Sequence, residues 1–526
     1  MTEQSKSLPR CRPEEVGISS KAISDFIDKI NTRNLGVHSF TVVRHGKIAA
    51  QCFWKPYDKD TAHIMYSMSK SVTSTAVGFA VSEGLLSVDD KVSKFFPEYK
   101  IRSMNKELTV RHLLTMTSDK VVPFTNKKNG TDWVKQFFDA PFLAKPGTVF
   151  NYLSENTHML SAIVTKVTGQ PIVDYLYPRI FEPLGIEKPF WEADGKGVNV
   201  GGSGLYMKSE DLAKFFLVYL NGGKYESKQI LPKEWIDEAT SFHVQTPKHG
   251  AIDNVCGYGY QFWRNHLKNS YRADGLFGQR CIIMPDYDAL VVINSGKAED
   301  YYMMDAFWEV FPKAFSDNPL ENDDEAYNEM LEKIENRELS PLPTAPRNFA
   351  TENGIENKTI RCKTNEFTSV LSISITQMLY KRPGKISSFK FNFKENSLLF
   401  TWCEKDEYNT IEASMNGGYG ISEIKLCGLK YTAYSQAAWQ PDGSLKLSIR
   451  PLGTAHVRLF TFFFQANGRV NVINESDPKF SELAVYYMSF IGAPLAKPII
   501  PTSKSAVNIF ATPVIEPNFN GKITNK

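Results

Sequence analysis

Apolar residues recur at helical spacing in four stretches of the first 320 residues. Residues 19–32 carry an apolar residue every three or four positions behind a Ser-Ser pair that can cap a helix. Residues 67–86 repeat this pattern with a strongly apolar face, and shorter stretches of the same kind lie at 159–167 and near 305–315. The pattern therefore predicts four helices, and the one over 67–86 is long and apolar.

Strand-like runs lie on both sides of this helical region. Residues 38–54 contain two such runs around the turn signal His45-Gly46, which predicts a β-hairpin. Far downstream, residues 257–263, 280–284 and 289–294 have the composition of further antiparallel strands. The simplest assembly is one sheet built from both ends of the region and covered by its first and last helices.

These elements predict an α/β (α+β) fold in a domain over 1–316. An antiparallel sheet is flanked by helices, and a helical subdomain of about 66–255 is inserted between its strands. Residues 317–345 are acidic, with one short helix and a proline-rich exit, which indicates a linker. Residues 346–526 alternate and are rich in turns, which predicts a C-terminal all-β domain, barrel-like or a sandwich. We expect its apolar segment 483–491 to be a closing helix.

Composition excludes several classes of function. The chain has 526 residues, 42% of them hydrophobic, and a formal net charge of +3. Because its lysines are interleaved with acids, we expect neither a nucleic-acid partner nor a membrane surface. The polar N-terminus and the seven dispersed cysteines, with no C-x-x-C pair, favour a reduced, cytoplasmic protein. The nine histidines lack metal-ligand spacing, so we expect no catalytic metal.

The run Tyr66-Ser67-Met68-Ser69-Lys70 carries the most specific chemistry. Ser67 and Lys70 lie on one face at the start of the predicted helix. The positive helix end and burial both lower the pKa of a lysine there, so its amine can take the proton of the serine hydroxyl. The same S-x-x-K spacing occurs elsewhere without a long apolar helix behind it, at Ser103, Ser387, Ser422 and Ser476.

A second acid/base group is expected in the segment KPGTVFNY. Tyr152 follows a Pro-Gly turn and precedes the helix over 159–167. A tyrosine in a loop is usually a packing residue, but a phenol whose pKa is lowered by a nearby ammonium can carry the serine proton to a leaving group. Tyr152 is therefore the candidate partner of Ser67 and Lys70.

Several blocks in order resemble the serine β-lactamase and penicillin-binding-protein superfamily. They include HSFTVVRHGKI, YSMSKSVTSTAVGFAVSEGLL, LTVRHLLTMTS, KPGTVFNY, GGSGLYMKSEDLAKF and ADGLFGQRCIIM, within residues 8–315. The chain is most similar to class C β-lactamases, family VIII esterases and 6-aminohexanoate-oligomer hydrolases. The resemblance implies that Ser67 is acylated, that Lys70 is its general base and that Tyr152 is the tyrosine of a Y-x-N motif.

The resemblance also assigns substrate-binding positions. Ser154 stands where the family has asparagine, and Ala273-Asp274-Gly275 corresponds to the K-T-G or W-G-G motif. The backbone N–H groups of Ser67 and Leu276 would form the oxyanion hole, and Gln279 follows on the same strand. Asp119 stands where the family commonly has glycine, and the sequence assigns it no role.

The missing K-T-G lysine disfavours efficient β-lactam hydrolysis. We therefore expect a serine hydrolase that forms an acyl-enzyme on Ser67 and acts on a small ester or amide without a cofactor. Two alternatives remain open: a D-amino-acid peptidase or β-lactamase, and a non-catalytic binding protein on the same fold. The C-terminal β domain would shape access to the site or make the protein a homo-oligomer.

Overall fold

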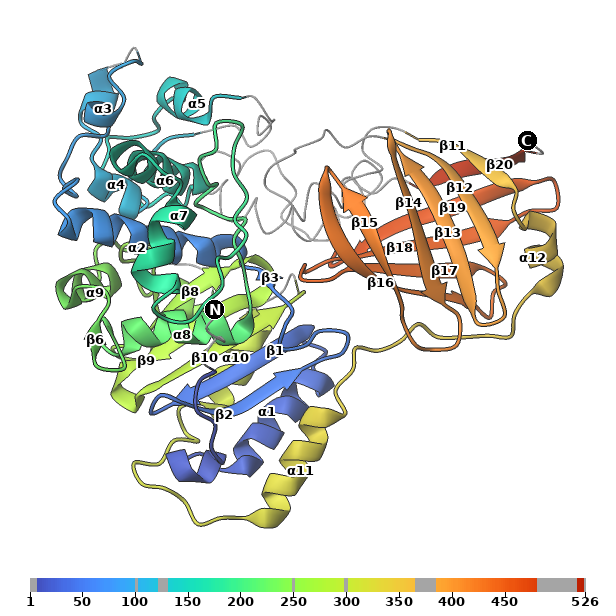
Figure 1. The fold of residues 1–526 in the computed structure, drawn as a ribbon, viewed down its shortest axis with the longest axis horizontal. Helices are drawn as coiled ribbons and strands as arrows, with labels where there is room; N and C mark the ends of the chain where they lie inside the picture. Colours follow the sequence, from blue (N-terminus) through green and yellow to red (C-terminus); the bar gives the residue numbers. More distant parts are fainter. Residues whose placement is uncertain are drawn as a thin grey trace. The chain divides into compact units, whose positions relative to one another are not determined.

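The computed structural model describes residues 7–99, 103–121, 131–247, 251–297, 301–364, 385–479 and 518–524. The chain divides into two compact units, Met1–Arg337 and Glu338–Lys526. Each unit has its own apolar core. Figure 1 shows the helices and strands of each unit.

The first unit is built on a six-stranded antiparallel sheet whose strand order is β2-β1-β10-β9-β8-β7. Strands from the beginning and the end of the unit therefore lie side by side, as the sequence predicts. The bounds are β1 Val37–Arg44, β2 Lys47–Phe53, β7 Trp263–Arg264, β8 Tyr271–Gly275, β9 Gln279–Met284 and β10 Ala289–Ser295.

Helices cover both faces of this sheet. Successive side chains of β1 point to opposite faces. The Phe40 ring meets Phe26 of α1 (Ser20–Thr32) at a centroid distance of 5.4 Å, whereas the Thr41 hydroxyl meets the Ser209 hydroxyl of α8 (Ser209–Leu220) at 2.9 Å. Helix α10 (Tyr301–Val310) also packs beside α1. The predicted helix over 19–32 is confirmed, and the one predicted near 305–315 is present but lies at 301–310.

The inserted subdomain is mainly helical. Its centre is α2, which begins at Ser69 and in which twelve consecutive residues from Ser69 to Ala80 are buried. Two short pairings of antiparallel strands, β3 with β4 and β5 with β6, complete it. The bounds are α2 Ser69–Ser82, α3 Val92–Phe95, α4 Val110–Leu114, α5 Trp133–Asp139, α6 Ser154–Thr168, α7 Ile172–Leu176, α9 Lys233–Thr240, β3 His63–Ile64, β4 Tyr206–Met207, β5 Lys224–Tyr225 and β6 Lys228–Gln229.

The strand predicted over 257–263 is wrong over most of its length. Only Trp263 belongs to a strand, β7, whereas Tyr258 makes isolated bridges to Val244 and Trp263. Gly257 and Gln261 have φ angles of 96° and 68°, which an extended strand does not allow. The alternation of aromatic residues therefore marks a buried, folded-back segment and not a strand.

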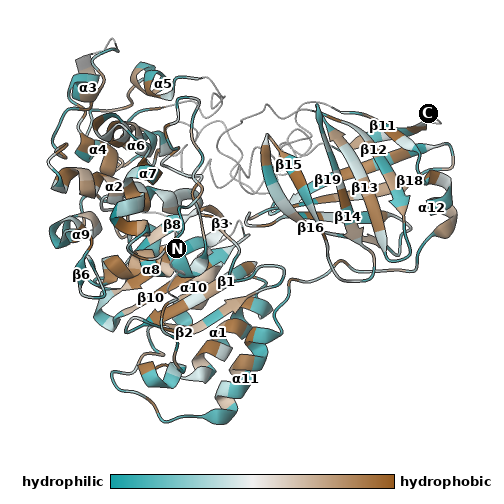
Figure 2. Cartoon of the chain, viewed as in Figure 1, coloured by the Kyte–Doolittle hydropathy of each residue, from teal (hydrophilic) through white to brown (hydrophobic). Residues whose placement is uncertain are grey.

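The division between the units falls inside the stretch predicted as a linker. Its helix α11 (Asp324–Glu335) packs against α1, and Lys333 forms a 2.7 Å ion pair with Asp28 of that helix. Arg12 pairs with Asp324 at the same distance. The helix carries many hydrophilic residues (Figure 2), but these interactions hold it in the first unit.

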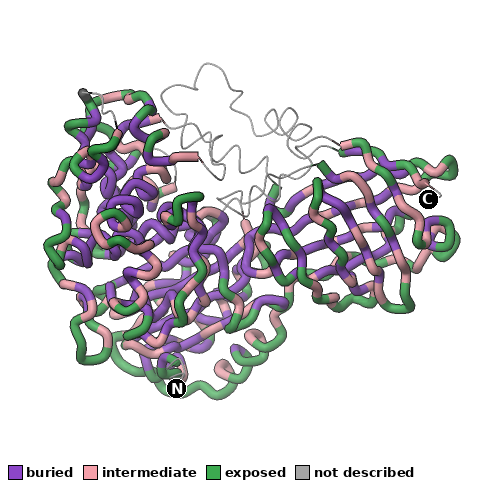
Figure 3. Tube along the Cα trace, turned by 45° about the horizontal axis from the view of Figure 1, so that its top comes forward, coloured by how far each residue is buried: buried purple, intermediate pink, exposed green. Residues whose placement is uncertain are grey.

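The second unit is a β-barrel. Its ten-stranded sheet has the order β14-β13-β12-β11-β20-β19-β18-β17-β16-β15, and a pairing of β14 with β16 closes it. Buried and more exposed residues alternate along its strands (Figure 3). The bounds are α12 Phe349–Ile355, β11 Thr359–Lys363, β12 Ile386–Phe393, β13 Ser397–Glu404, β14 Glu407–Ser414, β15 Gly420–Leu426, β16 Leu429–Trp439, β17 Leu445–Pro451, β18 Val457–Phe464, β19 Arg469–Asp477 and β20 Phe519–Thr524.

The barrel confirms the predicted C-terminal all-β domain. The helix expected over 483–491 lies outside the described residues. Within the described ranges, no helix has both the length and the apolar character needed to cross a membrane.

Close packing of α2 gives a first testable prediction. A Cβ added at Gly78 would lie 2.5 Å from the Trp235 indole nitrogen of α9. Gly78→Ala should therefore lower the melting temperature of the first unit by a few degrees, because overpacking costs roughly 1–3 kcal/mol and outweighs the helix-propensity gain of about 1 kcal/mol. Calorimetry of the full chain measures this.

Gly354→Ala is the matched control for this substitution. Gly354 also lies in a helix, α12, and nothing lies within 4 Å of its added Cβ. This variant should be neutral or slightly stabilising. A Gly78→Ala protein that melts at or above the wild-type temperature would show that α9 does not constrain α2.

Candidate active site

Ser67 and Lys70 lie against each other where the helical subdomain begins. Ser67 is in a 3-10 turn, Tyr66–Met68, that runs directly into α2. The Lys70 side chain turns back along the helix, and its Nζ lies 2.7 Å from Ser67 Oγ. Lys70 is 1% exposed, so its amine is removed from bulk water.

Two further oxygens contact the Lys70 amine. Nζ donates to the Gly202 carbonyl oxygen at 2.8 Å and lies 3.0 Å from Ser154 Oγ at the start of α6. These three contacts fit both protonation states. An ammonium donates three hydrogen bonds, whereas a neutral amine donates to Gly202 and Ser154 and turns its lone pair toward the Ser67 hydroxyl.

Gly202 approaches the site in a way that only glycine permits. A Cβ on this residue would lie 2.8 Å from the Ser154 carbonyl oxygen. A Cβ on its neighbour Gly201, at φ 71°, would lie equally close to the Thr157 carbonyl oxygen. The absence of side chains lets the Gly202 carbonyl reach Lys70. The sequence contains this element in the run GGSG, but residue types alone did not assign a contact to it.

Tyr152 lies beside the same amine. Lys70 Nζ is 4.9 Å from the centre of the Tyr152 ring. Three other aromatic side chains surround this tyrosine with centroid distances of 5.5–6.4 Å: Phe150, Tyr258 and Trp263. The latter two are almost fully buried, which agrees with core packing, and they frame the Tyr152 ring.

The turn before the nucleophile candidate is strained. Tyr66 has a φ angle of 44°, which is rare for a bulky residue and costs on the order of 1–3 kcal/mol. Its ring packs edge-on against Phe277 at 5.3 Å. This sharp turn between β3 and α2 places Ser67 beside β8, and periodicity alone does not reveal it.

The third sequence motif lies directly beside this turn. A Cβ on Gly275 would be 2.3 Å from the Met65 carbonyl oxygen and 3.3 Å from the Met68 nitrogen, so β8 touches the backbone around Ser67. The chain then turns through Leu276 to Gly278, with Phe277 at a φ of 64°. The Leu276 backbone is thereby placed next to the turn Tyr66–Met68, which holds Ser67.

Gln279 holds this second turn. It is fully buried, and its amide nitrogen donates to the Ser295 carbonyl oxygen at 2.6 Å and to the Leu276 carbonyl oxygen at 3.2 Å. Its amide oxygen accepts from Asn294 and from the Ser295 backbone. The side chain therefore contacts the protein backbone around Leu276.

Asp274 is paired with two arginines. Its carboxylate accepts from Arg272 Nε at 2.6 Å and lies 3.3 Å from Arg280 Nε. The other donors of the buried Arg272 bind oxygens of the segment 253–265, including Asn254 and Asn265 at 2.9 and 2.8 Å. Asp274 follows Ala273, which stands at the position of the K-T-G lysine. This chain therefore has a carboxylate there, and two of its own arginines balance the negative charge.

The structure gives a conformational reason for Asp119. This residue has a φ of 56°, a left-handed conformation that glycine favours and that aspartate tolerates better than most residues. Burial raises the pKa of its carboxyl group above the usual range, and a hydrogen bond from the Ala144 backbone opposes that shift. Asp119 therefore replaces glycine where the backbone demands a left-handed residue.

The first unit thus combines an antiparallel sheet and an inserted helical subdomain with a buried lysine that contacts a serine at the start of α2. Residues 23–306 match the family model described as Beta-lactamase, which covers more than half of the chain. The protein therefore belongs to the Beta-lactamase family, whose members are serine hydrolases.

Individual relatives are distant. A 6-aminohexanoate-dimer hydrolase of Paenarthrobacter ureafaciens is 23% identical over 48% of this chain and 71% of its own length. A putative D-alanyl-D-alanine carboxypeptidase of Salmonella typhimurium is 21% identical over 49% and 82%. The solved structure of a putative 6-aminohexanoate-dimer hydrolase from Bacillus anthracis is 20% identical, with a TM-score of 0.50 over 63% of this chain and 90% of that one, and supports the fold.

The buried histidines His38 and His63 are hydrogen-bonded to each other, and His63 lies on β3 just before the turn Tyr66–Met68. This pair gives a pH prediction. His63 Nδ1 donates to the Ile64 carbonyl oxygen at 3.0 Å, so its Nε2 must accept from His38 Nδ1. Burial lowers the pKa of His63 to about 4. Since the unfolded chain then binds more protons between pH 6.5 and 4, stability should fall by about 3 kcal/mol as the pH falls through that window.

Urea unfolding of the full chain between pH 7.5 and 4 measures this effect. His63→Gln is the comparison because glutamine does not titrate, so the first unit of this variant should lose less stability on acidification. His456, whose pKa burial lowers to about 3, acts in the same direction in the second unit and is present in both proteins. Equal slopes for the two proteins would exclude His63 as a source of acid sensitivity.

Proposed function

We propose that the protein is a serine hydrolase that forms an acyl-enzyme on Ser67 with a small ester or amide. The observation that carries this proposal is the 2.7 Å contact between Ser67 Oγ and the Nζ of the buried Lys70. Burial removes the Lys70 amine from bulk water, and the oxygens named around Nζ belong to two hydroxyls and one backbone carbonyl. That environment favours an amine able to accept a proton.

The reaction proceeds by proton transfer and acylation. Lys70 takes the hydroxyl proton while Ser67 Oγ attacks the carbonyl carbon of the substrate. The backbone N–H groups of Ser67 and Leu276 stabilise the oxyanion, and the Gly275 contact and the Gln279 hydrogen bonds hold both turns in place. We assign Gln279 this indirect role.

Tyr152 completes the proton path. Its phenol relays the proton from Lys70 to the leaving group, whose bond to the acyl carbon breaks. A water molecule then attacks the acyl-enzyme and gives its proton back along the same path, which releases the acid and restores Ser67. The reaction needs no cofactor.

The residues around the nucleophile support an ester or small amide as substrate. Asp274, paired with Arg272, stands beside the place where penicillin-recognising relatives have a lysine. Ser154 reaches Lys70 but is shorter than the family's asparagine. The relative named 6-aminohexanoate-dimer hydrolase gives an example of a small substrate in this family.

Two other functions remain as competing proposals. The relative described as a putative D-alanyl-D-alanine carboxypeptidase favours a D-amino-acid peptidase, with a β-lactamase as its variant. A non-catalytic binding protein would retain the fold alone, but the burial of Lys70 against Ser67 has no use in such a protein. All seven cysteines lie in the described part of the chain as free thiols, which supports a reducing, cytoplasmic location.

Covalent labelling tests the acyl-enzyme proposal. A fluorophosphonate probe should modify the wild-type chain at one site, because phosphonylation requires an activated serine. Ser67→Ala should abolish the labelling, and Lys70→Met should slow it by at least 100-fold because the hydroxyl loses its base. Intact-mass spectrometry and gel fluorescence measure the modification.

Ser387→Ala is the matched control. Ser387 is followed three residues later by Lys390, but it lies on β12, where alternate residues point to opposite faces. Its labelling should equal that of the wild type. Labelling that persists in Ser67→Ala, or an unlabelled wild type, would reject the proposed nucleophile.

A substrate panel separates the competing activities. With p-nitrophenyl esters, D-alanyl peptides and a chromogenic cephalosporin, we expect the esters to give the highest kcat/KM, because no K-T-G lysine is present to meet a β-lactam carboxylate. Higher kcat/KM for the cephalosporin or the D-alanyl peptides would instead identify a β-lactamase or a peptidase.

A further inference from the structure

Gln261 occupies an unusual place between the helices that carry the candidate catalytic groups. It lies in the segment wrongly predicted as a strand, is 2% exposed and has a left-handed φ of 68°. Such a conformation costs on the order of 1–3 kcal/mol in a residue other than glycine and persists only where the surroundings enforce it. The contacts of Gln261 therefore hold it in this conformation.

The Gln261 side chain joins α6 to the end of α4. Its amide oxygen accepts from the Thr157 hydroxyl at 2.7 Å, and its amide nitrogen donates to the Leu113 and Leu114 carbonyl oxygens at 3.1 and 2.7 Å. Thr157 is one helical turn after Ser154. The side chain thus fixes the first turn of α6, from which Ser154 reaches Lys70.

The Gln261 backbone joins the same point to α2. Its carbonyl oxygen accepts from the Ser71 hydroxyl at 2.7 Å, and Ser71 directly follows Lys70. Its backbone N–H donates to the Leu114 carbonyl oxygen at 3.2 Å. One residue therefore connects the helix of Lys70 with the helix of Ser154.

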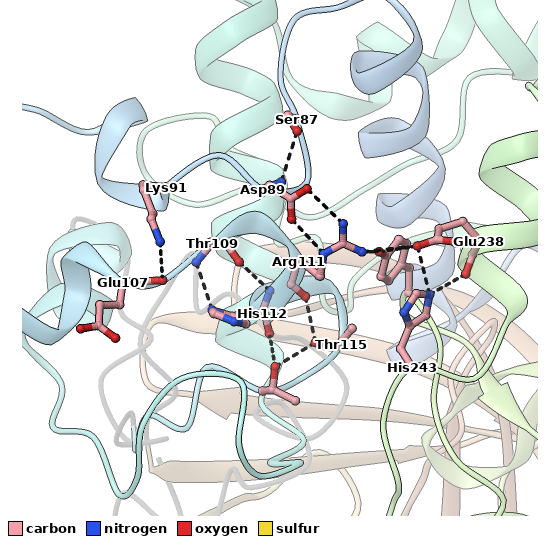
Figure 4. Close-up of polar contacts among 12 residues, drawn as sticks. Ser87, Asp89, Lys91, Glu107, Thr109, Arg111, His112, Thr115, Glu238 and His243 are labelled. Carbon is pink, nitrogen blue, oxygen red and sulfur yellow. Dashed lines mark hydrogen bonds and ion pairs between the residues drawn. The ribbon is translucent and has the colours of Figure 1, made fainter.

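The neighbours of Gln261 explain why its strained backbone is kept. Tyr260 receives a hydrogen bond from Arg111 of α4 and donates to Glu238 of α9 at 3.0 Å. Figure 4 shows the Arg111 guanidinium between Asp89 and Glu238. On the other side, Phe262 is fully buried, 4.9 Å from the Tyr219 ring. Because these contacts hold residues 260 and 262 in place, the backbone of residue 261 between them is held at its left-handed φ.

We propose that Gln261 is a positioning residue that sets the distance between α2 and α6 and so keeps Ser154 and Ser67 together at the Lys70 amine. The inference rests on the proposed serine-hydrolase function. Gln261 does not act on the substrate itself. It acts through the 3.0 Å contact between Ser154 Oγ and Lys70 Nζ, which excludes water from the amine.

Gln261→Gly is the most informative variant. Glycine adopts a φ of 68° without strain, so the variant removes the side chain and leaves the backbone bond to Ser71 available. We expect the fluorophosphonate labelling rate of Ser67 to fall about tenfold, since small displacements of catalytic groups cost one to two orders of magnitude. With a p-nitrophenyl ester, kcat per labelled site should fall while KM changes little.

The pH profile distinguishes positioning from simple stabilisation. If α6 loosens, water reaches the Lys70 amine and favours its protonated form, so the acidic limb of the rate–pH profile should move to higher pH. A merely structural residue would lower the melting temperature and the number of active sites without moving this limb. An unchanged limb and an unchanged rate per titrated site would overturn the proposal.

A double-mutant cycle tests the route through α6. Thr157→Val removes the hydroxyl that bonds the Gln261 side chain, so its effect on labelling should be non-additive with Gln261→Gly. Ser71→Ala breaks the other end of the same connection, between α2 and the Gln261 backbone, so its effect should also be non-additive with Gln261→Gly. Additive effects of Thr157→Val would reject the assigned route.

Two further variants keep the test decisive. Gln261→Asn retains the amide and tolerates the left-handed backbone, but its side chain is one methylene shorter. Its labelling rate should lie between those of the wild type and Gln261→Gly. It replaces Gln261→Gly in these experiments if that variant does not fold. Gln436→Ala is the matched control, because Gln436 is a buried glutamine that donates to two carbonyl oxygens in the second unit. Its labelling rate should not change. A wild-type protein that is not labelled would instead refute the proposed function.

Discussion

The candidate site depends on the burial of one amine. Lys70 is almost completely removed from water, and an amine in that position must find its hydrogen-bond partners in the protein. Those partners come from three places in the chain: Ser67 in the preceding turn, Ser154 on α6 and the Gly202 carbonyl oxygen. The Ser67 contact is local, whereas the Ser154 and Gly202 contacts join Lys70 to residues 84 and 132 positions away, so the site is complete only when the helical subdomain packs on α2.

This constraint explains why backbone strain collects around α2. Tyr66 and Gln261 are two bulky residues with positive φ that lie next to α2. Tyr66 turns the chain sharply just before Ser67, and the Gln261 carbonyl oxygen accepts a hydrogen bond from the Ser71 hydroxyl. Such conformations destabilise the fold locally and are kept only where dense packing allows no alternative. Here the packing is supplied by fully buried neighbours such as Phe277 and Phe262.

The sequence predicted those parts of the site whose geometry is local. Ser67 and Lys70 are separated by three residues in a helical pattern, so their contact follows from helix geometry. Tyr152 and Gly275 could be placed only through the order of motifs resembling a known family. Gly202 and Gln261 were not predicted, because a contact made by a carbonyl oxygen or across three helices leaves no periodic signal. The same limit explains the false strand at 257–263, where buried aromatic residues alternate without being extended.

The two departures from the family motifs share a physical logic. A serine at position 154 is too short to enclose the lysine amine as an asparagine would, but the close approach of Gly202 supplies a carbonyl acceptor at 2.8 Å. An aspartate at position 274 would place an uncompensated charge beside the nucleophile, but Arg272 and Arg280 pair with it. In both cases another group compensates for the change, a carbonyl from a distant segment at Ser154 and arginines from the same and the next strand at Asp274, and the Ser67–Lys70 contact stays intact. The chain therefore keeps the Ser67–Lys70 contact on which the proposed proton transfer rests, while the residues at positions 154 and 274 differ from the family motifs.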